Sequence, residues 1–551
     1  MFQVSSSQEA FDAIVVGSGA TGGWAAKELT EAGMKVALLE AGRNVTPADF
    51  TEHTQSWQLP YLGTGYAPKV VEDRPIQSKC YACTEYNYKW FVNDKENPYT
   101  QAKPFSWIRQ RVLGGRSLSW GRQSYRMGDV DFKAASRDGY GDDWPISLDE
   151  MVPYYERVER YVGISGQAEG LAQLPDSIFL PPMEMTCTEL ALRKAMKDKF
   201  GRVMTIGRAA ILTKTHNGRA ACHYCGPCER GCATFSYFSS PFTTVKDAKA
   251  TGRLTLLTDS PVARINVKDG KAASVTCVDA NTKQEREIKG KLVILCASTL
   301  ESTRILLNSN ICNSSGALGK YLMDHIYQGG ADGVMPMFEA KPWAGMPRRP
   351  NGIYIPRFRN IDKKEKNGFI RGYGYQGGSM PSFNFGAPGI GASYKDAVRK
   401  GEWGISVGVW GECLARKENF VEIDKDKVDA CGIPILKISA EWSDNEKKIF
   451  EDAREQGVAM LEAAGAREVR KTGKHSTFGH CIHEIGTARM GNNPKTSVLN
   501  KYNQAHDVPN IFCTDGAAWV SSGCQNPTLT MMAITVRACD YIKKEYSKQL
   551  A

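Results

Sequence analysis

No stretch of the chain approaches the roughly 20 consecutive apolar residues that a membrane-spanning helix needs, so we expect a protein that does not cross a bilayer. Internal repeats and low-complexity linkers are also lacking. The first ten residues are polar and show no basic segment followed by an apolar run. This predicts that the chain carries no secretory signal of its own.

Charge of one sign is not concentrated anywhere along the sequence. The chain has 70 Lys and Arg against 60 Asp and Glu, a net charge of +10, and its basic residues are scattered. Because no nucleic-acid-binding motif accompanies them, we interpret the excess as a solvated surface, with docking of an acidic redox partner as the alternative. Hydrophobic residues make up 42% and charged residues 24% of the 551 residues, which excludes a disordered, collagen-like or coiled-coil protein. This length predicts two large domains or about three or four smaller ones.

The beginning of the chain has the pattern of a nucleotide-binding unit. Residues 11–17 read FDAIVVG, an apolar run typical of a buried parallel strand. Residues 21–33 have helical spacing, and residues 35–40, KVALLE, form a second strand pattern that ends in an acid. The sequence therefore predicts a βαβ unit of about 30 residues.

Glycines lie where this unit would meet a pyrophosphate. Gly17, Gly19 and Gly22 form the GxGxxG spacing, which permits a tight turn and a close approach of backbone to ligand. The following helix offers free N–H groups at its N-terminus, and Glu40 can accept ribose hydroxyls. We predict dinucleotide binding, although the motif alone does not separate NAD from FAD.

Further segments along the chain narrow the choice of cofactor. They are WIRQRVLGGRSLSWGR at 107–122, VILCASTLESTRILL at 293–307, GKYLMDH at 319–325, HEIGTARMG at 483–491, and a tail at 515–532 that contains Asn-Pro-Thr. With the N-terminal unit they resemble the glucose–methanol–choline (GMC) oxidoreductases, in the family's order and along nearly the whole chain. The resemblance implies an FAD enzyme that oxidises alcohols or sugars.

The resemblance also implies a set of cofactor-binding residues. They are Gly17, Ser18, Gly19, Ala20, Gly22, Glu40, Ala41, Arg43, Val112, Gly114, Gly115, Ser117, Trp120, Val262, Ala297, Asp515, Gly516, Asn526 and Thr528. The Gly114–Gly115 loop can lie against the flavin ring because glycine has no Cβ to obstruct it. Some sugar oxidases of the family attach FAD through a histidine near this loop. Ser119 precedes Trp120 where that histidine would stand, so we predict non-covalent FAD.

Oxidising an alcohol requires a base for the hydroxyl proton while a hydride leaves, and a neutral histidine suits this role. His483 stands first in a segment that resembles the family's His-Pro-x-Gly-Thr motif, with Glu484 in place of the proline. The resemblance implies that His483 is the base and that Asn526, just before a proline, orients the substrate hydroxyl. His475 and His480 carry no motif, and we expect them to be structural or at the rim of the site.

A cysteine cluster needs its own explanation. Residues 222–232 read CHYCGPCERGC, which spaces Cys222, Cys225, Cys228 and Cys232 as C-x2-C-x2-C-x3-C. This is the ferredoxin spacing, apart from the terminal proline, and four thiolates on one loop can converge on an iron–sulfur cluster. Zinc is the alternative that the residues leave open, because CxxC pairs also bind zinc.

The resemblance favours iron and sulfur. A subset of GMC dehydrogenases carries a [3Fe–4S] cluster on a C-x5-C-x3-C spacing, which corresponds to Cys222, Cys228 and Cys232. Cys225 is then either a fourth ligand of a [4Fe–4S] cluster or a neighbour of a [3Fe–4S] cluster, and we favour [3Fe–4S].

Two cofactors of these kinds indicate a dehydrogenase. Flavin accepts a hydride, whereas a cluster accepts one electron at a time, so the pair suits transfer to an external cytochrome or ferredoxin. The branch most resembled is the iron–sulfur-containing sugar dehydrogenases, in which glucoside 3-dehydrogenases oxidise C3 of glucosides and disaccharides to 3-keto sugars. Dehydrogenases of gluconate, sorbose, glucose or polyols stay open, as does an oxygen-using oxidase. A non-enzymatic electron carrier is disfavoured because it would not need His483 and Asn526.

Partners and compartment follow from the same resemblance. Relatives commonly have a small subunit that carries an export signal, so we expect a small subunit, an electron acceptor and periplasmic location by co-export. Cytoplasmic residence is the alternative.

The predicted fold class is α/β, with an FAD-binding Rossmann-like domain of the GMC type and a substrate domain that has an antiparallel sheet. We expect the FAD domain to be discontinuous, at 1–45, 105–140, 245–325 and 495–551. Residues 46–104, 141–186 and 326–494 are assigned to the substrate domain and linking segments, and 187–244 to a cysteine-rich insertion.

The remaining cysteines and several aromatic residues have simpler interpretations. We expect the isolated cysteines to be small buried apolar residues: Cys187, Cys277, Cys296, Cys312, Cys413 and Cys539. Cys80 and Cys83 are predicted to form a surface disulfide or two packed thiols. Aromatic residues between 330 and 450 are expected mainly in the core, with stacking on sugar faces as the alternative: Trp343, Tyr373, Tyr375, Trp403 and Trp410.

Overall fold

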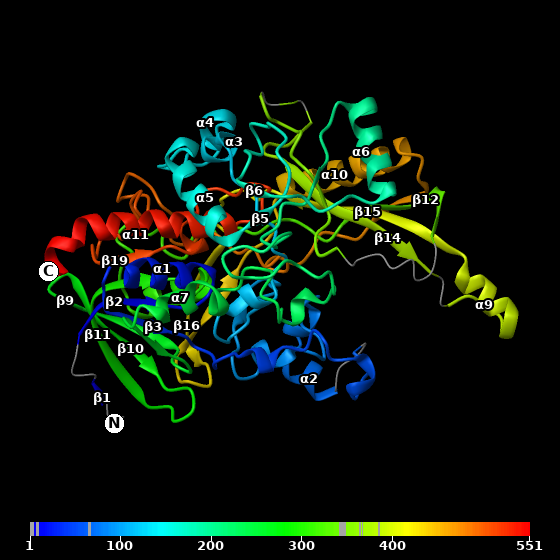
Figure 1. The fold of residues 1–551 in the computed structure, drawn as a ribbon. Coiled ribbons are helices and arrows are strands. Elements are labelled where there is room, and N and C mark those ends of the chain that lie inside the picture. Colours follow the sequence, from blue (N-terminus) through cyan, green and yellow to red (C-terminus); the bar gives the residue numbers. More distant parts are fainter. Residues whose placement is uncertain are drawn as a thin grey trace.

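The computed structural model describes residues 5–6, 10–63, 68–340, 349–362, 365, 367–383 and 386–550. Two large sheets lie at opposite ends of an α/β fold (Figure 1). The first sheet has the order β8 (Leu254–Leu257), β3 (Val36–Leu39), β2 (Phe11–Val16), β11 (Glu285–Leu295), β10 (Lys271–Val278) and β9 (Val262–Lys268). Strands β1 (Ser5–Ser6) and β19 (Ile511–Cys513) also pair with β11.

Strand β11 joins two kinds of pairing in this sheet. Its N-terminal part pairs antiparallel with β10, and its C-terminal part pairs parallel with β2 and β19. Strands β3 and β8 continue the parallel part. Strands β2 and β3 are buried on both faces, which explains the continuous apolar run of β2.

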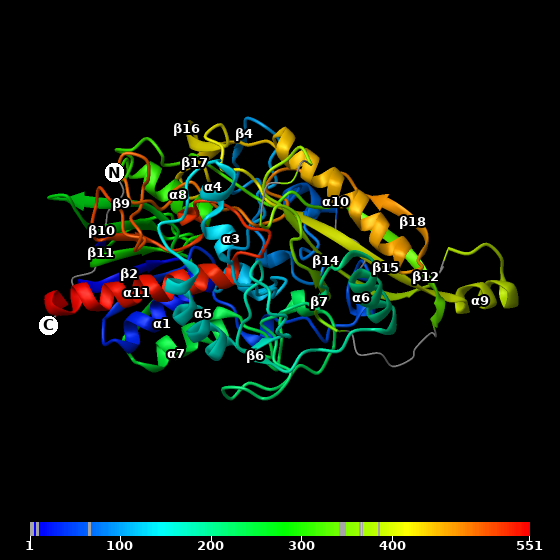
Figure 2. The same cartoon turned by 90° about the horizontal axis from the view of Figure 1, so that it is seen from above.

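Helices cover both faces of the parallel strands. Alternate residues such as Ala13 and Val15 face α1 (Ala20–Glu31) and α11 (Thr528–Leu550), while Ile14 and Val16 belong to the larger core that includes α8 (Thr299–Asn308). Helices α1 and α11 contact each other and lie along one side of the sheet with α7 (Thr244–Ala250) (Figure 2). The predicted strand, helix and strand at the start of the chain are thus confirmed as β2, α1 and β3.

The second sheet is antiparallel throughout. Its order is β18 (Arg467–Thr472), β12 (Gly330–Ala340), β15 (Gly401–Gly411), β14 (Tyr373–Ser382), β13 (Ile353–Ile355) and β7 (Thr205–Ile206). Helix α10 (Asp444–Ala463) packs on this sheet beside α6 (Cys187–Phe200). The expected antiparallel sheet is confirmed. A third, small sheet holds β16 (Phe420–Val428), β17 (Pro434–Ser439) and β4 (Thr100–Gln101).

Helix α5 (Leu148–Val162) packs on α11. The remaining helices and strands are short or peripheral: α2 (Pro68–Asp73), α3 (Asp129–Phe132), α4 (Ala134–Asp138), α9 (Gly391–Arg399), β5 (Ile164–Ser165) and β6 (Phe179–Leu180). Figure 1 shows α9 projecting from the far end of β14 and β15. No helix in the described part of the chain is long and apolar enough to cross a membrane.

The proposed domain boundaries can be set beside these elements. The first sheet draws its strands from 5–39, 254–295 and 511–513, and the second from 205–206 and 330–472. Strand β7 therefore links the predicted cysteine-rich insertion to the second sheet. Residues 105–140 add no strand to the first sheet; they supply a loop with a short helical turn at Gly115–Leu118, followed by α3 and α4. The boundaries themselves stay a prediction.

The isolated cysteines are buried, with one exception. Cys277, Cys296, Cys312, Cys413 and Cys539 are buried, as expected. Cys187 is exposed, which corrects the expectation for that residue, because it begins α6 directly after the capping Thr186. Cys80 and Cys83 are buried and are not joined in a disulfide, so the packed-thiol interpretation holds and the surface disulfide is wrong.

Candidate active site

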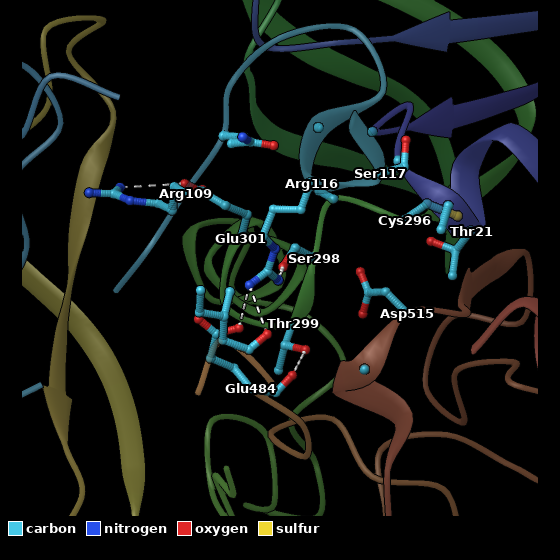
Figure 3. A pocket seen from close by; sticks show the side chains of 18 of the residues that line it. Thr21, Arg109, Arg116, Ser117, Cys296, Ser298, Thr299, Glu301, Glu484 and Asp515 are labelled. Carbon is cyan, nitrogen blue, oxygen red and sulfur yellow. Dashed lines mark hydrogen bonds and ion pairs between the residues drawn. The ribbon is translucent and has the colours of Figure 1, made fainter. Parts of the chain in front are cut away.

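A cavity of about 300 Å³ opens at the carboxyl ends of β2 and β3, beside the N-terminus of α1. This is where ligands bind in open parallel sheets. Figure 3 shows part of its lining, with Asp515 beside Thr21 and Cys296, and Glu484 paired with Arg116. The pocket therefore joins the N-terminal unit to two segments that follow more than 400 residues later in the chain.

Most predicted cofactor residues line this cavity, and so do both predicted catalytic residues, His483 and Asn526. The lining cofactor residues are Gly17, Ser18, Gly19, Ala20, Glu40, Ala41, Gly115, Ser117, Trp120, Val262, Ala297, Asp515, Gly516, Asn526 and Thr528.

Four predicted cofactor residues are absent from the lining. Gly22 packs beneath the turn, where a Cβ would lie 1.7 Å from the Gly17 carbonyl oxygen. Gly114 has φ +89° and its N–H donates to Ser18 Oγ over 2.8 Å. Arg43 and Val112 form a backbone bridge, and the Arg43 side chain turns away to Asp49 at 2.8 Å. These four support the walls of the pocket and do not face it.

The turn between β2 and α1 has the shape of a phosphate cradle. Gly17 has φ +93°, and a Cβ there would meet the Cys296 carbonyl oxygen at 2.5 Å. Gly19 caps α1 without a side-chain hydrogen bond, and nothing lies within 4 Å of a Cβ built on it. The N-terminal N–H groups of α1 thus face open space that suits an anionic group.

Glu40 ties this turn to β3. Its Oε2 accepts hydrogen bonds from the Ser18 N–H at 3.2 Å and the Ser18 hydroxyl at 2.5 Å, and its Oε1 accepts from the Gly42 N–H at 2.9 Å. Burial raises the pKa of Glu40 above its usual range, although the bonds from Ser18 and Gly42 oppose this shift. One lone pair on Oε1 stays available, which suits a ribose hydroxyl.

Arginines supply positive charge to the same pocket. Arg111 and Arg304 contact the Glu301 carboxylate at 3.1 and 3.3 Å, and Arg109 lies 3.8 Å from it. The buried Nε of Arg109 has no hydrogen-bond partner within the described residues. Burial lowers the pKa of Arg109 to about 10. Arg109 lines the same cavity as the glycine cradle, and its positive charge suits a cofactor with phosphates.

The predicted catalytic pair is brought together at the edge of the cavity. The Asn526 Nδ2 and His483 Nε2 atoms lie 3.3 Å apart, although the residues are 43 positions apart in the chain. Asn526 directly precedes the Pro527–Thr528 start of α11. Burial, then the neighbouring His325 and Arg116, holds the pKa of His483 well below its usual range. The imidazole is therefore neutral near pH 7 and able to accept a proton.

Comparisons with known proteins identify the family of this chain. Two family models described as GMC oxidoreductase match residues 11–327 and 415–535. The chain belongs to the GMC oxidoreductase family.

Individual relatives include several alcohol and sugar enzymes. The chain is 30% identical to 2-methyl-1,2-propanediol dehydrogenase of Mycolicibacterium austroafricanum, over 99% of this chain and 97% of that one. It is 24% identical to the fructose dehydrogenase large subunit of Gluconobacter japonicus, over 96% and 97%. It is 24% identical to a C-glycoside 3-oxidase of Microbacterium trichothecenolyticum, over 54% and 55%. The crystal structure of pyridoxine 4-oxidase from Mesorbium loti shares the fold, with a TM-score of 0.62, 17% identity and coverage of 96% and 98%.

The departure of this GMC oxidoreductase from the His-Pro motif has a structural explanation. The buried Glu484 carboxylate pairs with Arg116 at 2.8 Å, and Arg116 also donates to Ser298 Oγ at 2.9 Å and to the Ile482 carbonyl oxygen at 3.1 Å (Figure 3). Arg116 lies in the helical turn that follows Gly114. Glu484 therefore links the segment of the predicted base, His483, to the loop predicted to lie against the flavin.

Three residues near the pair are not among the predicted site residues. His325 lies 3.1 Å from His483, measured between the two Nδ1 atoms. Asp324 accepts the His483 backbone N–H at 3.1 Å, and Gln376 of β14 donates to Asn526 Oδ1 at 2.6 Å. The only sequence signal for the first two is that they end the GKYLMDH segment that resembles the family. For Gln376 the sequence has no signal, because β14 reaches Asn526 only in the folded chain.

The other histidines and the aromatic residues behave largely as expected. His475 is exposed and His480 is half-buried against Tyr327, and neither lines the cavity. Tyr373, Tyr375 and Trp403 are in the core. Trp410 is half-buried, with an Nε1 that lacks a hydrogen-bond partner within the described residues. Trp343 lies outside the described residues.

The four clustered cysteines form a half-buried loop behind the pocket. Cys222, Cys228 and Cys232 pack against an apolar cluster that contains Tyr237, whereas Cys225 is not part of that cluster. The Tyr237 hydroxyl donates to the Leu118 carbonyl oxygen, and Arg122 lies 5.5 Å above the Tyr237 ring. Because Ser119 to Gln123 line the cavity, the loop adjoins the pocket wall.

The chemistry of these side chains bears on the metal that they fit. All four are half-buried thiols that form no disulfide, so they can supply thiolate ligands to an iron–sulfur cluster or to tetrahedral zinc.

The glycine cradle gives a prediction that separates cofactor binding from folding. Gly19→Ala adds a methyl group where the protein leaves open space, at φ −63°, which alanine adopts without strain. We expect the unfolding temperature of the flavin-free protein to stay within about 2 °C of wild type, because nothing is displaced. Flavin affinity should fall by about tenfold or more, since the methyl group occupies the path of the pyrophosphate.

Flavin titration and thermal unfolding of the flavin-free protein would check both expectations. Gly22→Ala is the matched comparison, because its Cβ clashes with backbone and should destabilise the fold itself by about 3 kcal/mol or more. Unchanged flavin affinity in Gly19→Ala would show that the cofactor does not occupy this turn.

Proposed function

We propose that this GMC oxidoreductase is an FAD-dependent sugar dehydrogenase that oxidises a secondary hydroxyl, at C3 of glucosides or disaccharides, to a 3-keto sugar. We further propose that electrons leave through an iron–sulfur cluster, [3Fe–4S] on Cys222, Cys228 and Cys232, to an external acceptor. The observation that carries the proposal is the His483–Asn526 contact at one edge of a cavity that also contains the glycine cradle.

The chemistry divides between cofactor and protein. Non-covalent FAD, when bound, accepts the hydride from the substrate carbon. The protein must hold the substrate hydroxyl and remove its proton. His483 Nε2 faces Asn526 at the cavity edge, and its low pKa keeps it unprotonated at neutral pH. The Asn526 amide, held at its oxygen by Gln376, presents N–H groups that can orient a substrate oxygen as its charge develops.

The proposed cluster position suits electron exit. Its thiols lie in a loop that packs against Tyr237, next to the pocket wall at Trp120 and Arg122. Cys225 stands apart from the apolar cluster, which favours the three-cysteine set. An acceptor such as a cytochrome or ferredoxin would take the electrons one at a time.

Substrate class rests on the resemblance to glucoside 3-dehydrogenases, and the partial match to a C-glycoside 3-oxidase supports C3. The second candidate is a dehydrogenase of another sugar, polyol or aldonic acid. The match to a diol dehydrogenase over almost the full length favours this candidate. An oxygen-using GMC oxidase is a further alternative, which peroxide formation in air would reveal.

The proposed context is a complex with a small subunit. The similarity to a fructose dehydrogenase large subunit supports a subunit of this kind. We propose periplasmic location through co-export with a signal-bearing partner, with cytoplasmic residence as the alternative.

Product analysis tests the proposed reaction. The holoenzyme would be incubated with methyl α-glucopyranoside and an artificial electron acceptor, and the product analysed by ¹³C NMR. We expect a carbonyl at C3, no turnover of the matched 3-deoxy glucoside, and no peroxide in air. Oxidation at another carbon, or turnover of gluconate or 2-methyl-1,2-propanediol alone, would replace the C3 assignment with the second candidate.

A further inference from the structure

His325 lies next to the catalytic pair without reaching the cavity. Its side chain is 1% exposed, and it is not part of the lining. Its ring is nearly perpendicular to that of His483, at 84°, with the ring centres 5.0 Å apart. The two rings meet because Met323 and Ile485 form an antiparallel bridge with hydrogen bonds in both directions. In an antiparallel pairing, the residue two positions after Met323 lies opposite the residue two positions before Ile485. His325 therefore lies opposite His483.

A backbone carbonyl fixes where the proton of His325 lies. The Nε2 atom of His325 is 2.7 Å from the Gly523 carbonyl oxygen. A carbonyl oxygen only accepts, so Nε2 must carry the proton and donate it. In a neutral imidazole the other nitrogen, Nδ1, then has a free lone pair. Burial lowers the pKa of His325 to about 4, which keeps the ring neutral at pH 7.

That lone pair selects the tautomer of His483. The two Nδ1 atoms are 3.1 Å apart, and His325 Nδ1 can only accept there. His483 must therefore donate from Nδ1, which leaves its Nε2 unprotonated. The contact on the opposite side of the His483 ring requires the same tautomer. His483 Nε2 is 3.3 Å from Asn526 Nδ2, and because an amide nitrogen only donates, Nε2 must accept.

One competing partner lies close by. Cys481 Sγ is 3.4 Å from His483 Nδ1. If the thiol donated to that nitrogen, the lone pairs of the two Nδ1 atoms would face each other at 3.1 Å. A thiol is also a weak donor. The sulfur is therefore a second acceptor of the His483 Nδ1–H.

We propose that His325 is a positioning residue that holds His483 in its Nδ1–H tautomer, so that Nε2 is the atom that accepts the substrate proton. The chain of donors runs from Asn526 to His483 to His325 and ends at the Gly523 carbonyl oxygen. The catalytic part of this inference rests on the proposed function, whereas the tautomer itself does not.

Two substitutions test separately the contacts of the two ring nitrogens of His325, Nδ1 and Nε2. His325→Asn places an amide oxygen near the position of Nδ1, so it keeps an acceptor for His483 and loses the donor to Gly523. His325→Gln places an amide nitrogen near the position of Nε2, so it keeps that donor and loses the acceptor. We expect flavin reduction by substrate to slow by less than about tenfold in His325→Asn and by about 100-fold in His325→Gln. A residue that acts only through its structural bond to Gly523 would give the reverse order.

A spectroscopic measurement tests the tautomer without turnover. The chain has eight histidines, so selective ¹⁵N-histidine labelling gives an NMR spectrum in which the His483 signals can be assigned with His483→Gln. We expect a protonated Nδ1 and an unprotonated Nε2 in the wild-type protein. A protonated Nε2, or the reversed order of the two variants, would overturn the proposal. Failure of every sugar to reduce the wild-type flavin would instead remove the proposed function and leave the tautomer result standing.

Discussion

Replacing His483 with glutamine is expected to slow flavin reduction by about 10²- to 10⁴-fold, the usual contribution of a general base. Glutamine is similar in size and can form hydrogen bonds, but it cannot take the substrate proton. His483 contacts Asn526 and His325 and is not part of the glycine cradle, so flavin content should stay at the wild-type level. Anaerobic stopped-flow recording of flavin bleaching at saturating sugar measures the step without any acceptor.

His480→Gln is the matched control for this experiment. His480 is three residues away, half-buried against Tyr327, and does not line the cavity. Its substitution should leave the rate within about threefold of wild type, as for most changes away from reacting groups. A His483→Gln rate as high as that of the control, with flavin bound, would exclude His483 as the base.

The same base predicts the pH dependence of the wild-type enzyme. Only neutral His483 accepts a proton, so kcat/KM should rise with pH through the pKa of this group and then level off. Burial, His325 and Arg116 together place that pKa well below 6.5. We therefore expect kcat/KM to be constant from about pH 6 to pH 8 and to fall only in more acidic solution. An acid limb centred above 6.5 would show that another group titrates.

Local sequence patterns predicted the strand, helix and strand at the start of the chain. Strands β2 and β3, helix α1, the Gly17 turn and Glu40 lie within 30 residues of one another, so their spacing along the chain fixes their geometry. Sequence patterns did not show that Arg43 and Val112 lie outside the lining of the cavity. A residue close in sequence to a lining residue can form a backbone bridge to another segment and turn its side chain away. Arg43 does this, and its guanidinium pairs with Asp49.

The part of the site around His483 and Asn526 depends on contacts between distant segments. His325 reaches His483 across 158 residues through the Met323–Ile485 bridge, and Gln376 reaches Asn526 across 150. No periodicity or spacing in the sequence encodes such pairs, since register is decided when strands and loops pack. Resemblance to a family located His483 and Asn526 individually, whereas their partners required the fold.

Loss of one cluster ligand is expected to stop electron transfer to the acceptor while flavin reduction by the sugar continues. Cys228→Ser removes a thiol that belongs to both the three- and the four-cysteine set, and serine is a poor ligand for iron–sulfur clusters. The cysteine loop lies behind the pocket wall, not in its lining, so flavin reduction by sugar should proceed at the wild-type rate. Steady-state transfer to a one-electron protein acceptor should fall to background, together with the iron content. Cys187→Ser, which changes an exposed thiol outside the loop, should alter none of these.

Cys225→Ser decides which cluster is present. For [3Fe–4S], anaerobically purified wild-type protein should contain about three irons per FAD and give a near-isotropic EPR signal when oxidised. Cys225→Ser should keep both, because this thiol lies outside the apolar cluster that holds the other three. A silent oxidised spectrum with about four irons per FAD, lost in Cys225→Ser, would assign [4Fe–4S] with Cys225 as a ligand. Zinc without iron would exclude the iron–sulfur cluster and favour an oxidase, since the proposed one-electron route out of the flavin would then be missing.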